Sequence, residues 1–307
     1  VDWRVGEPPG SECREQLCPS GEYTDRYKRR WSDFGISLSR SHYPYGMVQF
    51  TPSYFSKRSG FVINQLSGGG CEHMGNFPTF PVKGKLKMSP DNILNYRINI
   101  SEEKGHAGYY EAMVQEDIKA KLTVTERTGM ANYEYPADQQ YGTVIIGGGI
   151  SATPIEQAAV VITAPNKCEG YAEGGNFCGL RTPYKVYFVA EFDADALESG
   201  TWKRDELKPN TTFAEGEYSG VYFTFDVSKK KNIQYKIGVS YVSVENAREN
   251  LKAENTGWDF LQIQNQAESK WNDYLGKIEV EGTNPDRTTQ FYTICIVRSF
   301  TRMYAVM

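Results

Sequence analysis

Three adjacent side chains that can bind metals or transfer protons, those of Cys71, Glu72 and His73, directly follow the three glycines at residues 68–70. The glycines end an apolar run that begins at Phe61. A thiolate, a carboxylate and an imidazole in one loop can ligate a metal, act in catalysis or contact a ligand as loop residues. The other reactive side chains, and the elements that position the loop, decide between these alternatives.

Other candidates for catalysis or metal binding are few. Histidine occurs only at His42, His73 and His106, and no C-x-x-C pair is present, so the sequence does not predict a zinc site. There is also no G-x-S-x-G motif. A glycosidase needs two carboxylates that face one bond, about 6.5 to 9.5 Å apart in an inverting enzyme. Carboxylates adjacent in sequence, such as Glu102 and Glu103, are interpreted as solvated turns. We assign no catalytic residue and no metal ligand.

A second glycine cluster lies in the segment TVIIGGGISATPIE, residues 143–156. An apolar run followed by Gly147, Gly149 and Ala152 resembles the turn that binds the pyrophosphate of a dinucleotide. However, the following Thr-Pro would interrupt the first turn of the expected helix, and the next residues, AAVVITA, are typical of a strand. We favour a glycine-rich bend between two strands, with nucleotide binding as an alternative.

The cysteines fit an exported protein. Cys13 and Cys18 are close in sequence, as are Cys168 and Cys178, and both pairs lie in segments with glycine or proline, so we favour local disulfides over free thiols. Cys71 and Cys295 are then expected to be unpaired. The chain begins VDWRVG, without Met, which is compatible with removal of a leader. These features favour a secreted or periplasmic location.

Charge and hydropathy exclude two classes of partner. The net charge of the 307 residues is −4 and the pI is about 5.6, which argues against nucleic-acid binding through phosphate contacts. No apolar stretch approaches the roughly 18 to 20 residues that a membrane span needs. We therefore expect neither a nucleic acid nor a membrane span.

Most of the chain has the pattern of a β protein. From residue 46 to about residue 242, short apolar or alternating runs such as YKVYFVAEF and IQYKIGVSYV are separated by Gly, Pro, Asn or Asp. No long helical pattern intervenes, so parallel βαβ units are not expected. Residues 1–242 are predicted to form an antiparallel β-sandwich domain.

Helical patterns follow the strands. Ser243 is a suitable N-cap for a helix over ENARENLKAEN. A second helix, which ends near Gly276, carries apolar residues at four-residue spacing, namely Ile263, Ala267, Trp271 and Leu275. Residues 243–282 are predicted to be a helical linker.

The last segment begins a further helix. Asn284 is its expected cap and Pro285 its first residue, and the segment is apolar on most sides as far as Met307. A helix that is hydrophobic all round is normally buried by other elements. We interpret residues 283–307 as the truncated start of a helical domain of a longer protein.

Six motifs occur in one order, from Tyr43 to Tyr292. They are YPYGMVQFTPSY, NQLSGGGCEHMGNFPTFP, EKGHAGYY, LTVTERTGMANYEYP, KIGVSYVSVENARENLKAENTGWDF, and ESKWNDYLGKIEVEG followed by FYT. In this order and spacing the chain resembles the amino-terminal domain of glycoside hydrolase family 92, the calcium-dependent exo-α-mannosidases. The block around VSVENARENLKAE and GWDF is the most diagnostic.

The resemblance implies a mainly β fold, a supersandwich-like antiparallel β-sandwich followed by linker helices and the first helix of an absent (α/α)6 barrel. It implies that the general acid, the base and the calcium ligands belong to the barrel, so no cofactor is expected in these residues. It further implies an inverting exo-α-mannosidase whose partners are a mannose-containing glycan and the missing barrel domain. The fragment alone would be inactive.

The resemblance also suggests a role for the first glycine loop. In the family the active site lies between the two domains, and SGGGCEHMG matches the position that faces the barrel. Gly69, Gly70, Cys71, Glu72 and His73 are therefore interpreted as substrate-binding residues in the wall of the sugar pocket. A glycine turn merely packed against the barrel is the main alternative, and a metal site is the least favoured.

Two other function classes stay open. A stand-alone carbohydrate-binding sandwich would use exposed aromatic side chains to stack on sugar faces, and it would be a soluble monomer with its last helix intact. A nucleotide-binding oxidoreductase would use the segment IIGGGIS, and flavin absorbance of the purified protein would reveal it.

Overall fold

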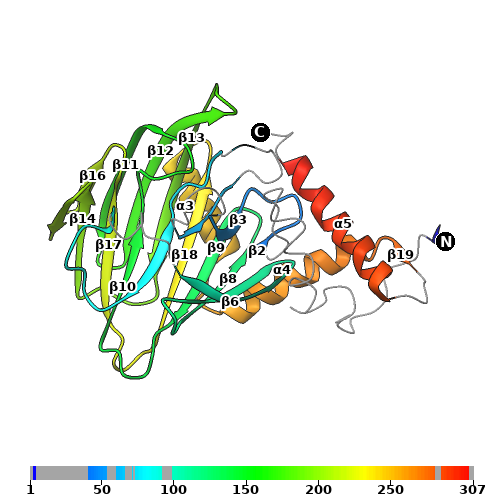
Figure 1. Ribbon diagram of the computed structural model, residues 1–307, viewed down its shortest axis with the longest axis horizontal. Coiled ribbons are helices and arrows are strands. Elements are labelled where there is room, and N and C mark those ends of the chain that lie inside the picture. Colours follow the sequence, from blue (N-terminus) through cyan, green and yellow to red (C-terminus); the bar gives the residue numbers. More distant parts are fainter. Residues whose placement is uncertain are drawn as a thin grey trace.

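The chain folds around two antiparallel sheets that lie face to face (Figure 1). The computed structural model describes residues 3–4, 41–53, 60–65, 71, 73–91, 99–280 and 285–303. In β12 (Lys167–Phe177), buried side chains at every second position face the opposite sheet, and the intervening side chains are partly exposed. Strands with one apolar face are stable only when that face is covered, so they pair in two layers. The prediction of a mainly β, antiparallel sandwich is confirmed.

The order of the strands places neighbours in sequence next to each other in most of the structure. The first sheet runs in the order β15 (Glu206–Pro209), β14 (Glu198–Lys203), β17 (Ser219–Asp226), β10 (Tyr141–Ile146), β5 (Thr79–Lys83), β4 (Phe61–Val62), β3 (Gln49–Pro52) and β2 (Ser41–His42). The second sheet runs in the order β16 (Phe213–Glu215), β11 (Ile155–Ala164), β12, β13 (Leu180–Phe192), β18 (Asn232–Ser240), β9 (Thr128–Glu134), β8 (Ile118–Val124), β7 (Tyr109–Val114) and β6 (Ile100–His106).

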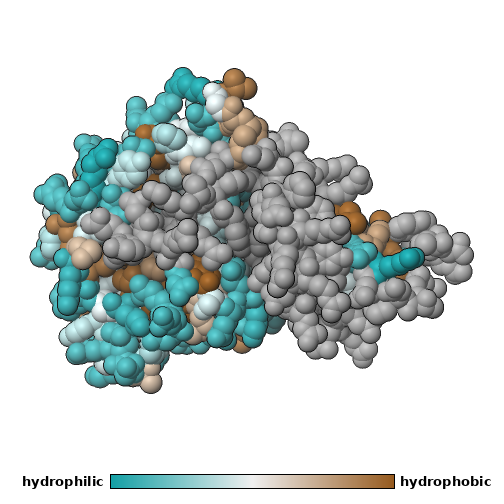
Figure 2. Space-filling view, in the orientation of Figure 1, coloured by the Kyte–Doolittle hydropathy of each residue, from teal (hydrophilic) through white to brown (hydrophobic). Residues whose placement is uncertain are grey.

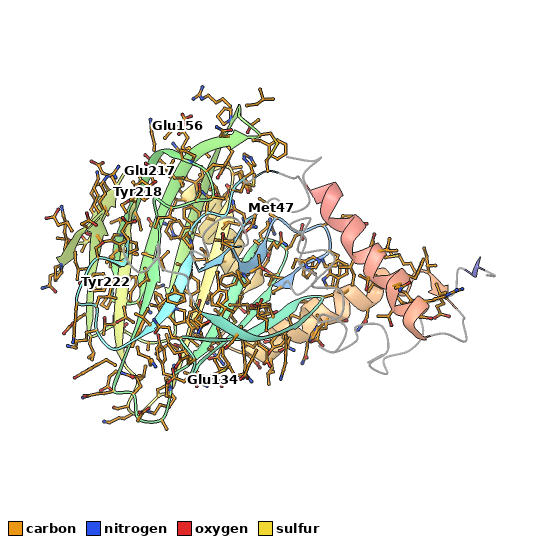
Figure 3. The ribbon with its side chains drawn as sticks, viewed as in Figure 1. Met47, Glu134, Glu156, Glu217, Tyr218 and Tyr222 are labelled. Atoms are coloured by element: carbon orange, nitrogen blue, oxygen red, sulfur yellow. A yellow bond between two sulfur atoms is a disulfide. The ribbon has the colours of Figure 1, made fainter. Side chains whose placement is uncertain are left out.

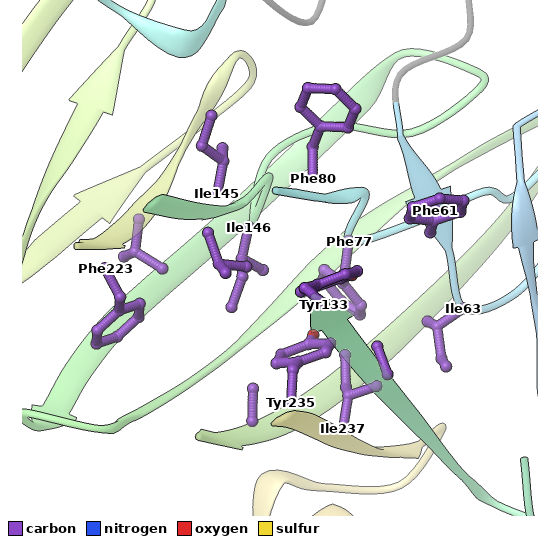
Figure 4. Close-up of a cluster of buried hydrophobic side chains, with 14 of the residues drawn as sticks. Phe61, Ile63, Phe77, Phe80, Tyr133, Ile145, Ile146, Phe223, Tyr235 and Ile237 are labelled. Atoms are coloured by element: carbon purple, nitrogen blue, oxygen red, sulfur yellow. The ribbon is translucent and has the colours of Figure 1, made fainter. Parts of the chain in front are cut away.

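Aromatic and branched side chains from both sheets fill the space between the layers (Figure 4). Phe192 of the second sheet lies 4.9 Å, between ring centroids, from Phe223 of the first sheet. The rings of Phe77 and Phe188 are 4.3 Å apart, and both side chains are fully buried. Because a buried aromatic side chain contributes more apolar area than an aliphatic one, the high aromatic content stabilises the contact between the layers.

Helix α3 (Val244–Glu254) packs on the outer face of the second sheet, against β13 and β18. Its N-cap is Ser243, whose side chain accepts a hydrogen bond from the Asn246 amide, as predicted from the sequence. The close approach of α3 to β18 requires a glycine in the strand, because a Cβ atom at Gly238 would lie 2.6 Å from the carbonyl oxygen of Ala247 in the helix. At the end of the helix, Glu254 accepts a hydrogen bond of 2.8 Å from the Arg127 amide.

Helix α4 (Phe260–Leu275) covers another part of the same face, against β7, β8 and β9. The four apolar residues predicted to form its buried stripe, Ile263, Ala267, Trp271 and Leu275, are all buried. The Trp271 indole donates a hydrogen bond of 2.7 Å to the carbonyl oxygen of His42, so it fixes the helix to the edge of the first sheet. Gly108, with a φ of 87°, allows the helix to pass the turn between β6 and β7.

Helix α5 (Pro285–Met303) follows β19 (Glu279–Val280), which pairs with β1 (Trp3–Arg4). Tyr292 of α5 is buried, and its hydroxyl donates a hydrogen bond of 3.1 Å to the carbonyl oxygen of Ile278. In Figure 1 this helix lies beside α4, away from the sandwich. Pro285 is its first residue, as predicted; Asn284, the predicted cap, lies outside the described residues.

Hydrophilic side chains cover most of the visible face of the sandwich (Figure 2). In the portion of the chain that the structure describes, no helix has both the length and the apolar character needed to cross a membrane.

Candidate functional site

The first glycine loop joins β4 to β5 at one end of the sandwich, and its described residues are 63–65, 71 and 73–78. Its backbone is strained, since Met74 and Phe77 have φ values of 59° and 54°, in the left-handed region that side chains other than glycine rarely adopt. Gly75 between them also has a positive φ, of 75°. Left-handed side-chain-bearing residues this close together persist only where surrounding contacts hold them.

Two backbone segments supply those contacts. The Asn64 side-chain oxygen accepts a hydrogen bond of 2.8 Å from the Asn76 amide, and the Asn64 carbonyl accepts one from the Gly75 amide. The Met74 carbonyl accepts a hydrogen bond of 2.8 Å from the Ala152 amide. The second glycine segment therefore helps to support the first.

That second segment is a bend and not a nucleotide-binding turn. β10 ends at Ile146, the amide of Gly147 donates a hydrogen bond of 2.9 Å to the Pro78 carbonyl, and the next element is the strand β11 rather than a helix. A Cβ atom at Gly149 would lie 2.0 Å from the Gly216 carbonyl oxygen, so this glycine is required for close backbone packing. The preferred prediction is confirmed, and the dinucleotide alternative is wrong.

A disulfide joins the first loop to the turn between β12 and β13. Cys71 is bonded to Cys178, with 5.4 Å between their Cα atoms and a sequence separation of 107 residues. The predicted local pair of Cys168 and Cys178 is therefore wrong. Cys168 lies on the inward face of β12 with no exposed surface, and burial raises the pKa of its thiol. The predicted pair of Cys13 and Cys18 lies outside the described residues.

His73 packs against the same turn and retains only 7% of its surface exposed. Its ring meets those of Phe177 and Tyr184 edge-on, at centroid distances of 5.6 and 5.3 Å. Its Nδ1 donates a hydrogen bond of 3.3 Å to the carbonyl oxygen of Asn176. Burial lowers the pKa of His73 and outweighs this hydrogen bond, which acts in the opposite direction. Burial therefore favours the neutral imidazole, and a bond to a carbonyl oxygen favours the tautomer that carries its proton on Nδ1.

Buried polar groups continue inward from the loop. The Tyr184 hydroxyl donates a hydrogen bond of 2.7 Å to the side-chain oxygen of Asn76, and the Asn64 side-chain amide donates one of 3.2 Å to the Tyr241 hydroxyl. Asn76 is fully buried, and its side-chain nitrogen has no acceptor among the residues that the structure describes. Such a network specifies one loop conformation, because each alternative leaves further buried groups unpaired.

The structure therefore places two of the five predicted site residues, Cys71 and His73, against the β12–β13 turn. Gly69, Gly70 and Glu72 lie outside the described residues, so their predicted role in substrate binding stays a prediction.

Sequence reasoning missed the partners of the loop in the β12–β13 turn, above all Cys178. A signal was present, because Cys168 alternates with polar residues in the run KCEGYAE and so points into the core. A thiol on the inward face cannot reach a turn at the end of its own strand. That observation leaves Cys178 available for a distant partner.

The arrangement can shape a surface but supplies no assignable catalytic group. In the described part of the chain no three His, Cys, Asp or Glu side chains come together in a group that could hold a metal ion. At the start of β13, Arg181 forms two hydrogen bonds of 3.0 and 2.8 Å with Glu156 on β11, but both side chains are exposed, so this ion pair contributes little (Figure 3). A disulfide and a buried imidazole therefore hold the loop against this end of the sandwich.

Comparison with known proteins identifies the fold and its family. Residues 35–240 match the glycosyl hydrolase family 92 N-terminal domain, and residues 246–302 match the family 92 catalytic domain. This chain belongs to glycosyl hydrolase family 92. The first match contains the candidate loop, the β12–β13 turn and the glycine bend that supports them.

Individual relatives agree with this assignment. An uncharacterized secreted glycosidase from Arthroderma benhamiae is 25% identical over 252 residues, which cover 74% of this chain and 32% of the fungal protein. The family 92 glycosyl hydrolase ccman5 superimposes with a TM-score of 0.75 at 22% identity, covering 87% of this chain and 39% of that one. The inverting mannosidase BT2199 from Bacteroides thetaiotaomicron gives a TM-score of 0.73 at 24% identity, and the match covers 86% of this chain and 36% of BT2199.

The two solved structures share the fold of this chain. The chain spans about a third of the length of the fungal relative and of BT2199. The family 92 N-terminal sandwich is thus present, together with a region that matches part of the family 92 catalytic domain.

Proposed function

We propose that this chain is the amino-terminal, pocket-forming part of a secreted or periplasmic inverting exo-α-mannosidase that removes α-linked mannose from glycans. The observation that carries the proposal is the pair of family 92 matches, to the N-terminal domain and then to the catalytic domain, in one chain. The names of the structural relatives supply the substrate class. BT2199 is an inverting mannosidase, and BT3965, an α-mannosidase from the same bacterium, was also solved in complex with mannoimidazole.

An inverting hydrolysis needs one carboxylic acid to protonate the leaving oxygen and a second carboxylate to activate water. We assign neither group to the sandwich and propose that both belong to a complete catalytic domain. The sandwich would instead position the sugar. A preorganised wall lowers the entropic cost of aligning the glycosidic bond with the two carboxylates.

The candidate loop fits such a wall, because its contacts hold its shape before any sugar binds. Met74 and Phe77 are held in left-handed conformations, and burial lowers the pKa of His73 and so favours its neutral form. Gly69, Gly70, Cys71, Glu72 and His73 remain the residues that we propose to line the pocket. Cys71 would contribute through its backbone, since its sulfur is bonded to Cys178.

Calcium is expected with the catalytic domain, where it would act as a Lewis acid toward a sugar hydroxyl. The described residues offer no group of three side chains suited to holding it. We therefore derive no step of the reaction through calcium.

The test compares two proteins, residues 1–307 alone and the same residues joined to a complete family 92 catalytic domain. Each is incubated with an α-linked mannobiose, and the released sugar is followed by proton nuclear magnetic resonance. The joined protein should release mannose first as the β anomer, because inversion converts an α linkage to a β product. Residues 1–307 alone should release none, with or without calcium.

Two results would contradict the proposal. Release of α-mannose as the first product by the joined protein would exclude inversion. Mannose release by residues 1–307 that persists at constant specific activity through repurification would show that the sandwich is itself catalytic.

A further inference from the structure

A pocket of about 630 Å³ lies on the outer face of the second sheet, where the start of α4 meets β7, β8, β9 and β18. Its volume is within the range of about 300 to 1,000 Å³ that is usual for small-ligand sites. It shares no residue with the loop and turn described above. In Figure 1 the start of α4 lies at the lower side of the sandwich and the β12–β13 turn at the top.

Aromatic and aliphatic side chains form one part of the wall. Trp258 precedes α4, and the ammonium group of Lys236 lies 4.4 Å from the centroid of its indole ring. Lys236 also donates a hydrogen bond of 3.0 Å to the Asn255 carbonyl, which holds its ammonium group beside the indole. Leu261 extends the wall at the rim, with 66% of its surface exposed. Tyr109 lines the pocket from β7.

Two amide side chains form the polar floor. Asn132 of β9 and Gln234 of β18 are directly opposite each other in the antiparallel register, and both line the pocket. Asn132 is 92% buried, since only 8% of its surface is exposed. The side-chain oxygens of both residues are buried and receive no hydrogen bond within the described portion of the chain. Buried amide oxygens without donors are costly, and a hydroxyl group of a ligand would satisfy them.

The cations around the pocket are paired with carboxylates, and the carboxylate of Asp259, which also lines the pocket, accepts a hydrogen bond of 3.0 Å from the Gln262 amide as the N-cap of α4. Lys121, which lines the pocket, forms an ion pair with Glu134, which Figure 3 shows at the lower edge of the sheet. Lys236 below the indole has Glu191 at 3.6 Å. With its cations compensated in this way, the pocket is not suited to a phosphate or a carboxylate. The lining combines an indole with two neutral amides, which suits a ligand with an apolar face and several hydroxyl groups.

We propose that this pocket binds one neutral hexose unit of a glycan, with a ring face on Trp258 and hydroxyl groups on Asn132 and Gln234. Only the further statement that the hexose belongs to the glycan being hydrolysed rests on the function proposed above. The pocket would then hold the glycan at a second point, remote from the loop of Cys71 and His73.

The experiment uses saturation-transfer nuclear magnetic resonance and titration calorimetry on the full 307-residue chain, with mannose, glucose, galactose and an α-linked mannobiose as probes. Binding with a dissociation constant in the millimolar range, about −4 kcal/mol at 1 mM, is expected for at least one hexose. Asn132→Leu and Gln234→Leu should each weaken it at least tenfold. Because each substitution removes a buried oxygen without a donor, the melting temperature should be unchanged or higher.

Two further variants keep the result interpretable. Gln157→Leu changes the same side-chain type at an exposed position of β11, outside the pocket, and should leave binding unchanged. Leu261→Glu alters the exposed rim without touching the core and should weaken binding even if an Asn132 variant fails to fold.

The outcomes separate this proposal from the catalytic one. Absence of binding by all four probes at 20 mM would overturn the pocket proposal and leave the mannosidase proposal intact. Binding that is unaffected by Asn132→Leu, Gln234→Leu and Leu261→Glu would also overturn it. Binding of glucose or galactose but not of mannose would support a hexose pocket that does not hold the proposed substrate.

Discussion

Removing the bridge between Cys71 and Cys178 should destabilise the sandwich strongly, and the size of the effect follows from the loop that it closes. The two cysteines are 107 residues apart in sequence. A cross-link that closes a loop of about 100 residues stabilises the fold by about 4.7 kcal/mol, because it restricts the unfolded chain. With an unfolding entropy of about 2.1 cal/mol/K per residue, 307 residues give about 0.65 kcal/mol/K. Removal of the bridge is therefore expected to lower the melting temperature by about 7 °C.

The assay compares the wild-type chain with the double variant Cys71→Ser, Cys178→Ser by calorimetry, with and without reductant. Reductant should lower the melting temperature of the wild type to that of the double variant. The double variant is the matched control, because any change in its melting temperature on addition of reductant must come from the other cysteines. Peptide mapping without reduction should recover one cross-linked peptide that contains Cys71 and Cys178.

Two results would refute this reasoning. A cross-linked peptide joining Cys168 to Cys178 would restore the local pairing and contradict the inward position of Cys168. A melting temperature of the double variant within about 1 °C of the wild type would show that the bridge does not restrict the unfolded chain as the loop-closure argument requires.

Two further predictions concern single side chains. Burial lowers the pKa of His73 below the unfolded value of about 6.5. Its contribution to the free energy of unfolding should therefore be fully present above pH 6.5 and should be lost as the pH falls through the folded pKa. His73→Gln, which keeps a neutral donor, should therefore lose less stability than the wild type between pH 7.5 and 5, and equal losses would contradict a depressed pKa. Trp271→Ala should cost about 3 to 5 kcal/mol, since it removes a fully buried indole and its hydrogen bond to His42. In calorimetry, Lys270→Ala, at an exposed position of the same helix, should have almost no effect, and equal melting temperatures for the two variants would exclude the docking role of Trp271.

The alternating runs and the helix signals were sufficient to predict the architecture, because they are local. Ser243 caps α3 through its own side chain, and the apolar stripe from Ile263 to Leu275 is set by helix periodicity. The order of strands in the two sheets was not predictable in the same way, since β5 pairs with β10 across a long interval of sequence. Pairings of this kind depend on the whole core and not on any one segment.

The candidate loop shows why a site is harder to predict than a fold. Its residue types were visible in the sequence, but their environment was not. Cys71 is fixed by a cysteine 107 residues away, and His73 is buried by Phe177 and Tyr184 of the two strands that flank the same distant turn. The spacing of Cys, Glu and His therefore suggested ligands, whereas the fold uses at least two of the three side chains to hold the loop.

These contacts also bear on how a sandwich can serve a catalytic domain. The loop follows β4 of the first sheet, and the turn to which it is bonded belongs to the second sheet, so the disulfide and the His73 packing join the two layers at one end of the sandwich. A wall attached to only one layer would shift whenever the sheets moved relative to each other. A wall attached to both layers keeps its shape, and misplacement of a bound sugar by as little as about 1 Å can slow a reaction by about a hundredfold. Structural use of Cys71 and His73 is thus compatible with a role for this loop in the pocket, because positioning a sugar requires the rigidity that these two residues provide.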